Sequence, residues 1–105
     1  MEPLSESIRR KIREGNYRFS HHAVQRCFEQ GIVIEDVVEG VTRGCEVIEN
    51  YPDDPRGHSC LVLTFTKDDR PLHVVIGVSD PSLIIIITVY EPDPRRWENF
   101  RIRRG

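Results

Sequence analysis

The chain has 105 residues and a formal net charge of −2, with 38% hydrophobic and 30% charged residues, which fits a single domain over residues 1–105. Three cysteines, an odd number without regular spacing, argue against a disulfide framework. Leu83–Ile87 is the main aliphatic run and is too short to span a membrane, and the charged start of the chain does not resemble a signal peptide. We therefore expect a cytoplasmic protein without a membrane partner.

The first half of the chain predicts three short helices, at about residues 5–14, 21–30 and 34–43. Ser20 stands directly before the second helix, where a side-chain N-cap is favoured, and a glycine follows each of the three segments. The third helix has apolar residues at positions i, i+3, i+4 and i+7, which is the pattern of a helix with one buried face.

The second half predicts four strands, at residues 45–50, 58–66, 72–78 and 83–90. The connections between them are short and rich in turn residues, so neighbouring strands should be antiparallel. The expected fold class is α+β, with two to three N-terminal helices packed on one face of a four-stranded antiparallel sheet.

Side chains of a strand alternate between its two faces, so the pattern predicts which face is buried. The face assigned to the helices is wholly apolar and includes Leu61, Leu63, Phe65, Leu72, Val74, Ile76, Leu83, Ile85, Ile87 and Val89. The other face carries polar side chains. If four-residue loops close both hairpins, Thr64, His73 and Thr88 lie in one row, with Tyr90 one step beyond. This row is a candidate site on a rigid floor, although threonines are also ordinary strand formers.

Charge is distributed unevenly along the chain. Residues 27–55 hold eight acidic side chains against the single Arg43, whereas residues 91–105 hold five arginines against three acids. The first 26 residues are also basic on balance. A nucleic-acid partner would therefore meet the two ends of the chain, unless these are ordinary solvated faces.

Several short motifs, taken in order, resemble a known family. They are Phe19-Ser20-x-His22-Ala23-x-x-Arg26, Gly31-Ile32, Val47-Ile48-x-x-Tyr51-Pro52, Pro71-Leu72-His73-Val74-Val75 and Ile87-Thr88-Val89-Tyr90-x-Pro92-Asp93. Their order and spacing resemble the small bacterial family called domain of unknown function 4258, over residues 15–97, with 98–105 left as a basic tail. That family is similar in organisation to RelE-like toxins, which are small ribonucleases with an antitoxin partner. The resemblance implies a RelE-like fold, an RNA substrate and a possible antitoxin.

Cleavage of RNA without a metal needs a base, an acid and a cation near the phosphate. His73 and His22 are candidates for base and acid, because imidazole titrates near neutral pH. Tyr90 can donate a proton or stack on a base, and Arg26 lies one helical turn after His22, where it can bind phosphate. His22 and Arg26 could alternatively tie their helix to the sheet. The predicted catalytic residues are His22, Arg26, His73 and Tyr90, and the predicted substrate-binding residues are Thr64, Thr88, Arg95 and Arg96.

No cofactor or metal is expected. His58-x-Cys60 places two possible ligands on one strand face, but the chain has no Cys-x-x-Cys or His-Glu-x-x-His pair. The predicted function is a metal-independent endoribonuclease of the toxin–antitoxin type. Two alternatives remain open: a non-catalytic protein-binding or regulatory module that uses the mixed sheet face, and a homodimer without a site.

Overall fold

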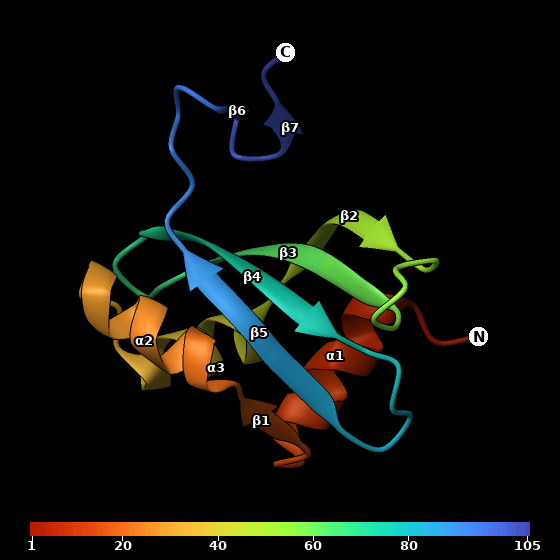
Figure 1. Cartoon of the computed structure of the whole chain (residues 1–105). Coiled ribbons are helices and arrows are strands. Elements are labelled where there is room, and N and C mark those ends of the chain that lie inside the picture. Colours follow the sequence, from red (N-terminus) through yellow and green to blue (C-terminus); the bar gives the residue numbers. More distant parts are fainter.

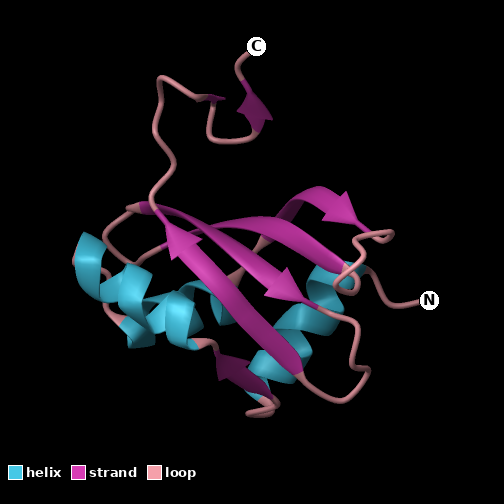
Figure 2. Ribbon diagram, in the orientation of Figure 1, coloured by secondary structure: helices cyan, strands magenta, loops and turns pink.

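The computed structural model describes all 105 residues and has two layers with a tail on the open side (Figure 1). Three helices lie along one face of a five-stranded sheet, and a short two-stranded hairpin stands on the opposite side (Figure 2). The helices are α1 (Leu4–Arg13), α2 (His21–Gln30) and α3 (Ile34–Arg43). The strands of the sheet are β1 (Tyr17–Phe19), β2 (Glu46–Tyr51), β3 (Ser59–Phe65), β4 (Pro71–Gly77) and β5 (Ile84–Tyr90), and those of the hairpin are β6 (Trp97–Glu98) and β7 (Ile102–Arg103).

The sheet has the strand order β1-β5-β4-β3-β2 and is mixed. The α+β class with three helices is confirmed, and the four predicted strands are antiparallel neighbours. The expectation of a four-stranded antiparallel sheet is incomplete, because β1 adds a fifth strand that runs parallel to β5. Only three residues of β1 pair, too few for a periodic signal, and its partner lies more than sixty residues later in the chain.

The second and third helices begin and end where the sequence predicts. The Ser20 hydroxyl accepts a hydrogen bond from the backbone N–H of Ala23 at 3.0 Å and donates one to the Ile87 carbonyl at 2.8 Å. It therefore caps α2 and also joins that helix to β5. Gly31 ends α2 in the left-handed conformation, with φ of 63°. The first helix begins at Leu4 without a side-chain cap, rather than at a serine.

The helix-facing side of the sheet holds the main core, but two strands contribute the residues that the sequence pattern placed on the other side. On β3 the buried helix-facing residues are Cys60, Val62 and Thr64, instead of Leu61, Leu63 and Phe65. The cause is the β3–β4 connection. Residues 67–69 form a three-residue loop with Asp69 in the left-handed region (φ 63°), and Thr66 pairs with Arg70. One residue fewer in the loop reverses the faces of β3 relative to β4.

A bulge divides β5 into two parts. The side-chain directions predicted for the part before the bulge are wrong, and those predicted for the part after it are correct. Val75 pairs with Thr88 but Ile76 pairs with Ile86, so Ile87 is the extra residue. Before the bulge, Ile84 and Ile86 are buried under the helices, and Ile85 faces the opposite side. After it, Val89 faces the core while Thr88 and Tyr90 face away, as predicted.

The face of the sheet opposite the helices, here called the tail face, is partly covered by residues 91–105, here called the C-terminal tail (Figure 1). Leu61 and Leu63 lie on this face and are nevertheless buried, as are His73 and Trp97. The domain thus has a main core under the helices and a small second core under the tail. None of its helices is long and apolar enough to cross a membrane.

Candidate functional site

One row of side chains crosses four strands of the tail face. Glu46 of β2, Leu63 of β3, His73 of β4 and Tyr90 of β5 are successive partners in the strand register. The predicted row of Thr64, His73 and Thr88 is therefore wrong. Leu63 takes the place expected for Thr64, and Tyr90 takes the place expected for Thr88.

Within this row His73 is fully buried, because the C-terminal tail covers it. Its Nε2 lies 2.6 Å from the Phe100 carbonyl oxygen, which can only accept, so Nε2 carries the proton and donates. Nδ1 then accepts from the Tyr90 hydroxyl at 3.1 Å, and the Trp97 ring packs edge-on at 4.5 Å between centroids. Burial lowers the pKa of His73 below its ordinary value, although the bond to Phe100 acts in the opposite direction.

The tail is held to the sheet by arginines as well as by Trp97. The guanidinium of Arg103 donates to Glu49 at 2.8 and 3.1 Å, and that of Arg101 donates to Glu46 at 2.9 Å. Partial burial alone would raise the pKa of Glu49, but bonds from Arg103 and Tyr51 hold it below the ordinary value. Arg103 also stacks over the Trp97 ring at 4.6 Å. Glu46 and Glu49, part of the acidic segment 27–55, thus hold the basic tail.

Between the tail and α2 lies a pocket of about 560 Å³, here called the arginine pocket. The five arginines that line it are Arg26, Arg95, Arg96, Arg103 and Arg104. Its acidic side chains are Glu91 and Asp93, and its aromatic ones are Tyr90 and Trp97. An excess of guanidinium groups around a hollow with two aromatic rings favours an anionic ligand.

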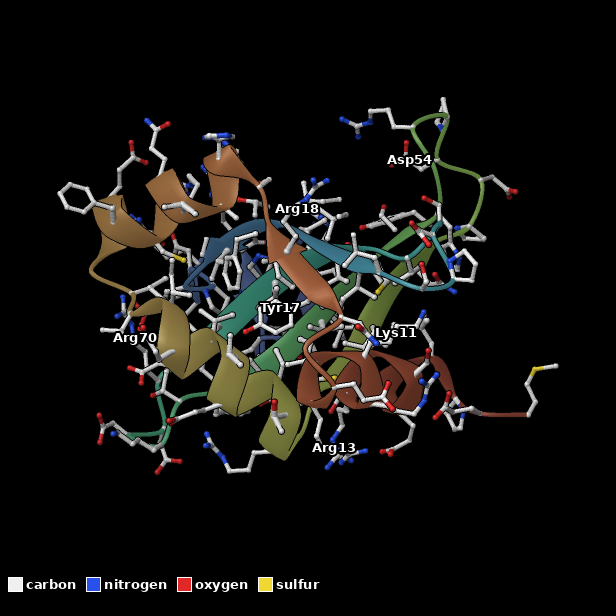
Figure 3. All side chains as sticks on the ribbon, turned by 90° about the horizontal axis from the view of Figure 1, so that it is seen from below. Lys11, Arg13, Tyr17, Arg18, Asp54 and Arg70 are labelled. Carbon is white, nitrogen blue, oxygen red and sulfur yellow. The ribbon has the colours of Figure 1, made fainter.

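The C-terminal end of α2 is fastened to the end of β5, and this brings Arg26 beside Tyr90. The Gln30 side chain donates to the Val89 carbonyl at 3.1 Å and accepts from the Glu91 N–H at 3.1 Å, so it pairs with the backbone on both sides of Tyr90. Arg70 completes the joint by bonding the Gln30 and Gly31 carbonyls and the Glu91 carboxylate (Figure 3). The pocket wall is therefore built on rigid elements.

The arginines of the pocket differ in how far they are already neutralised. Arg95 pairs with Asp93 at 3.0 Å, and Arg103 is committed to Glu49. Arg26 has only a long contact of 3.4 Å with Glu29, and Arg96 makes no side-chain hydrogen bond or ion pair. Arg26, Arg96 and Arg104, whose side chain bonds only the Pro94 carbonyl, are thus the pocket cations that no close ion pair neutralises. Burial raises the pKa of Tyr90, although the positive charge of Arg103 opposes this, so its phenol stays protonated at neutral pH.

The structure gathers four of the predicted site residues and separates the others. Arg26, Tyr90, Arg95 and Arg96 line the arginine pocket. The residues left outside it are His22, His73, Thr64 and Thr88.

Each of those four lies where its strand or helix places it. His22 is exposed on α2, one turn before Arg26. His73 touches the pocket only through Tyr90 and Trp97. Thr64 is buried on the helix side, where its hydroxyl donates to the Gly44 carbonyl at 2.8 Å. Thr88 is on the tail face beside Val75 but lines no pocket.

Sequence reasoning missed the pocket residues Gln30, Glu91, Trp97, Arg103 and Arg104. A signal for the last three existed, because the only Trp of the chain stands among the five arginines of the tail. No comparable signal marks Gln30 or Glu91, whose roles depend on the contact between α2 and β5. No group of three or more His, Cys, Asp or Glu side chains is arranged to hold a metal ion.

Comparison with known proteins gives one match. The family model described as Domain of unknown function (DUF4258) matches residues 19–91, which run from the end of β1 to the residue after β5. No curated protein and no solved structure matches the chain. The matched residues contain Arg26, Tyr90 and Glu91 of the arginine pocket, and its remaining arginines lie in the tail beyond them.

Proposed function

The chain belongs to the family described as Domain of unknown function (DUF4258), and we propose that it is a metal-independent endoribonuclease of the toxin–antitoxin type with its site in the arginine pocket. One observation carries the proposal. Arg26 of α2 lies more than sixty residues before Tyr90 of β5 and the tail arginines, and all of them line one pocket. A positive hollow of this kind fits the phosphodiester backbone of RNA better than a neutral or cationic ligand.

The reaction needs no metal or cofactor. The 2′-oxygen of RNA attacks the adjacent phosphorus and loses its proton to a base, the bond from phosphorus to the 5′-oxygen breaks, and that oxygen takes up a proton. The products are a 2′,3′-cyclic phosphate and a 5′-hydroxyl. The phosphorane that forms on the way carries extra negative charge, which guanidinium groups held in place before the reaction would stabilise.

Arg26 and Arg96 are assigned to the phosphate oxygens, because no strong ion pair occupies them. Tyr90 is assigned as the proton donor: its raised pKa keeps the phenol protonated, and its hydroxyl turns from His73 Nδ1 to the leaving 5′-oxygen to give up this proton, which the phenolate then regains from water. His22, which lies on the Arg26 side of α2, and Glu91, which lines the pocket, are the two candidates for the base. His73 is not assigned a proton-transfer role. Both of its nitrogens are occupied, and it positions Tyr90 and the tail instead.

The proposal includes the RelE-like similarity and the antitoxin. The helices cover one face of the sheet, and the C-terminal tail covers part of the other face. The arginine pocket lies at the rim between them, where a partner protein can reach it. An antitoxin would neutralise the ribonuclease by placing acidic side chains against Arg26 and Arg96, which the charge of the pocket favours.

The test is cleavage of a mixed RNA by the purified chain in the presence of a metal chelator. We expect 2′,3′-cyclic phosphate ends, and a rate about 100-fold lower in Arg96→Ala and in Tyr90→Phe. Arg13→Ala is the matched control, because Arg13 is exposed at the end of α1 in the helix layer (Figure 3). His22→Ala and Glu91→Gln distinguish the two candidate bases. Only replacement of the residue that acts as the base should remove the acidic limb of the pH–rate profile. A folded chain that cleaves no RNA after removal of any bound partner would contradict the proposal.

A second candidate function is the non-catalytic protein-binding module. The observation that favours it is a second hollow on the tail face, lined partly by Val75, Ile85 and Ile87, which the tail leaves uncovered. This candidate predicts that the folded chain neither binds nor cleaves RNA, so the same assay separates the two functions.

A further inference from the structure

The second hollow of the tail face has a volume of about 290 Å³ and is here called the apolar groove. Its floor is formed by Val75 and Gly77 of β4 and by Ile85 and Ile87 of β5. Ile87 is 37% exposed, an unusual state for an isoleucine in a five-stranded sheet. The bulge in β5 causes this exposure, because Ile87 is the residue without a partner on β4. The groove is therefore a consequence of the backbone and is present without a ligand.

The apolar groove and the arginine pocket lie along the same strand. Tyr90 lines the pocket and Ile87 lines the groove, and the two are three positions apart on β5, which is about 10 Å of strand. Both side chains are on the tail face. A ligand with alternating charged and apolar parts could therefore occupy both hollows at once.

The rim of the groove favours an uncharged group inside it. Asp54 and Asp80 line the groove together with Arg56, which pairs with Asp54 at 3.3 Å, so the charged groups there offer no excess of positive charge to hold a phosphate over the floor. A small aliphatic floor with Gly77 next to the Ile85 and Ile87 side chains instead suits a flat, largely apolar ring. The volume is at the lower end of the range for ligand pockets, which fits one ring system better than a peptide helix.

An exposed arginine lies on β1, the edge strand that borders β5. Arg18 of β1 is the register partner of Ile85, so it belongs to the tail-face side of the sheet edge. It is exposed and makes no side-chain hydrogen bond or ion pair. Cations thus stand near Tyr90, where Arg26 and Arg96 line the pocket, and on the strand beside Ile85, where Arg18 is located.

We propose that the substrate is single-stranded RNA and that the apolar groove is the subsite for one unpaired base next to the phosphate held in the arginine pocket. This inference rests on the proposed ribonuclease function and adds the strandedness of the substrate and a second subsite. The sugar–phosphate backbone runs along β5 from Arg96 and Arg26 towards Arg18, and the base turns inward onto Ile85 and Ile87. A base in a duplex is stacked and paired, so it cannot turn into the groove without opening the helix.

The test measures binding, so that it does not depend on cleavage. The probe is a fluorescent single-stranded 2′-O-methyl oligonucleotide, which has no free 2′-hydroxyl to attack the phosphate. A second probe has the same length and charge but lacks bases. The variant is Ile87→Ser, and the matched control is Val33→Ser, because Val33 is 54% exposed at the start of α3 on the helix side.

We expect Ile87→Ser to weaken binding of the probe with bases about tenfold and to leave the probe without bases unchanged. Val33→Ser should change neither affinity, and a duplex of the same sequence should bind more weakly than the single strand. Equal affinities of the wild type for the two probes, or equal losses for both in Ile87→Ser, would overturn the base subsite even if the arginine pocket cleaves RNA. Failure of the wild type to bind either probe would overturn the proposed function together with this inference, and would favour a protein segment in the groove.

Discussion

Replacement of Trp97 by Ala should release the C-terminal tail from the sheet. The Trp97 side chain is 5% exposed, and truncation of a buried Trp to Ala costs about 3–5 kcal/mol. The other anchors are weaker. The Arg103–Glu49 and Arg101–Glu46 pairs are partly exposed and contribute at most about 1 kcal/mol each, and the bond from His73 to Phe100 contributes about 1 kcal/mol. The ring of Trp97 is therefore the largest single contribution to holding the tail against the sheet.

Hydrogen exchange at the Arg104 amide measures this release directly. In the native chain that N–H donates to the Arg96 carbonyl at 2.8 Å, a bond that exists only while the tail is folded. A loss of about 3 kcal/mol corresponds to exchange more than a hundredfold faster. The amides of β4 should remain protected, because the main core lies on the other side of the sheet. The pKa of His73 should rise towards its ordinary value in the same variant, since its burial depends on the tail.

Ile102→Ala is the control for this experiment. Ile102 lies in the same hairpin but is 61% exposed, so its truncation should change stability by no more than about 0.5 kcal/mol. The reasoning is refuted if exchange at Arg104 is no faster in Trp97→Ala than in Ile102→Ala. That result would mean that the ion pairs, and not the ring, hold the tail.

Three further predictions concern groups whose position differs from the sequence expectation or was not expected at all. The folded-state pKa of His73 is lowered, so the unfolded chain binds a proton that the folded chain excludes, and stability should fall as the pH drops from about 7.5 through the unfolded pKa of about 6.5. Urea unfolding at several pH values should show this fall, and His73→Gln should reduce it. Thr64→Val removes the hydrogen bond to the Gly44 carbonyl and should cost about 1 kcal/mol, whereas Thr88→Val should be near neutral; equal costs in thermal unfolding would contradict the assignment of Thr64 to the helix side. Gly40→Ala should destabilise by about 1–3 kcal/mol despite the better helix propensity of Ala, because the new Cβ would lie 3.0 Å from a β3 carbonyl oxygen, and an unchanged melting temperature would show that α3 can move away freely.

Local signals explain why the helices were predicted well. Ser20 caps the start of α2 with a hydrogen bond, and Gly31 ends the helix in the left-handed conformation. Both effects are local, so the ends of α2 can be predicted from the sequence. The order of β2 to β5 was also predictable, because short connections force antiparallel neighbours. β1 was not, since it pairs with a strand that is distant in sequence.

Side-chain direction was less predictable, because it depends on single-residue details. A loop of three residues rather than four reversed β3, and one bulge at Ile87 reversed half of β5. Apolar residues occupy both faces of these strands, so hydrophobic pattern could not reveal either change. The consequence for the site is large. Thr64 lies on the helix side of the sheet instead of the tail face, and Leu63 is the register partner of His73 in its place.

Charge and motif order selected Arg26, Tyr90, Arg95 and Arg96, which line one pocket in the structure, but their proximity could not be read from the sequence. His73 was expected to be a base on the polar face of the sheet, because imidazole titrates near neutral pH. The tail buries it, and no periodic pattern in residues 91–105 predicts where that segment folds back.

The dependence of RNA affinity on salt tests the central claim, that the arginine pocket binds the RNA backbone, most directly. Binding of the 2′-O-methyl probe should weaken with increasing salt, and each lost phosphate contact should reduce the slope of log affinity against log salt by about 0.7. We predict that Arg96→Ala reduces the slope by this amount and that Arg13→Ala leaves it unchanged. Equal slopes in Arg96→Ala, Arg13→Ala and the wild type would show that RNA, if it binds at all, does not bind in this pocket.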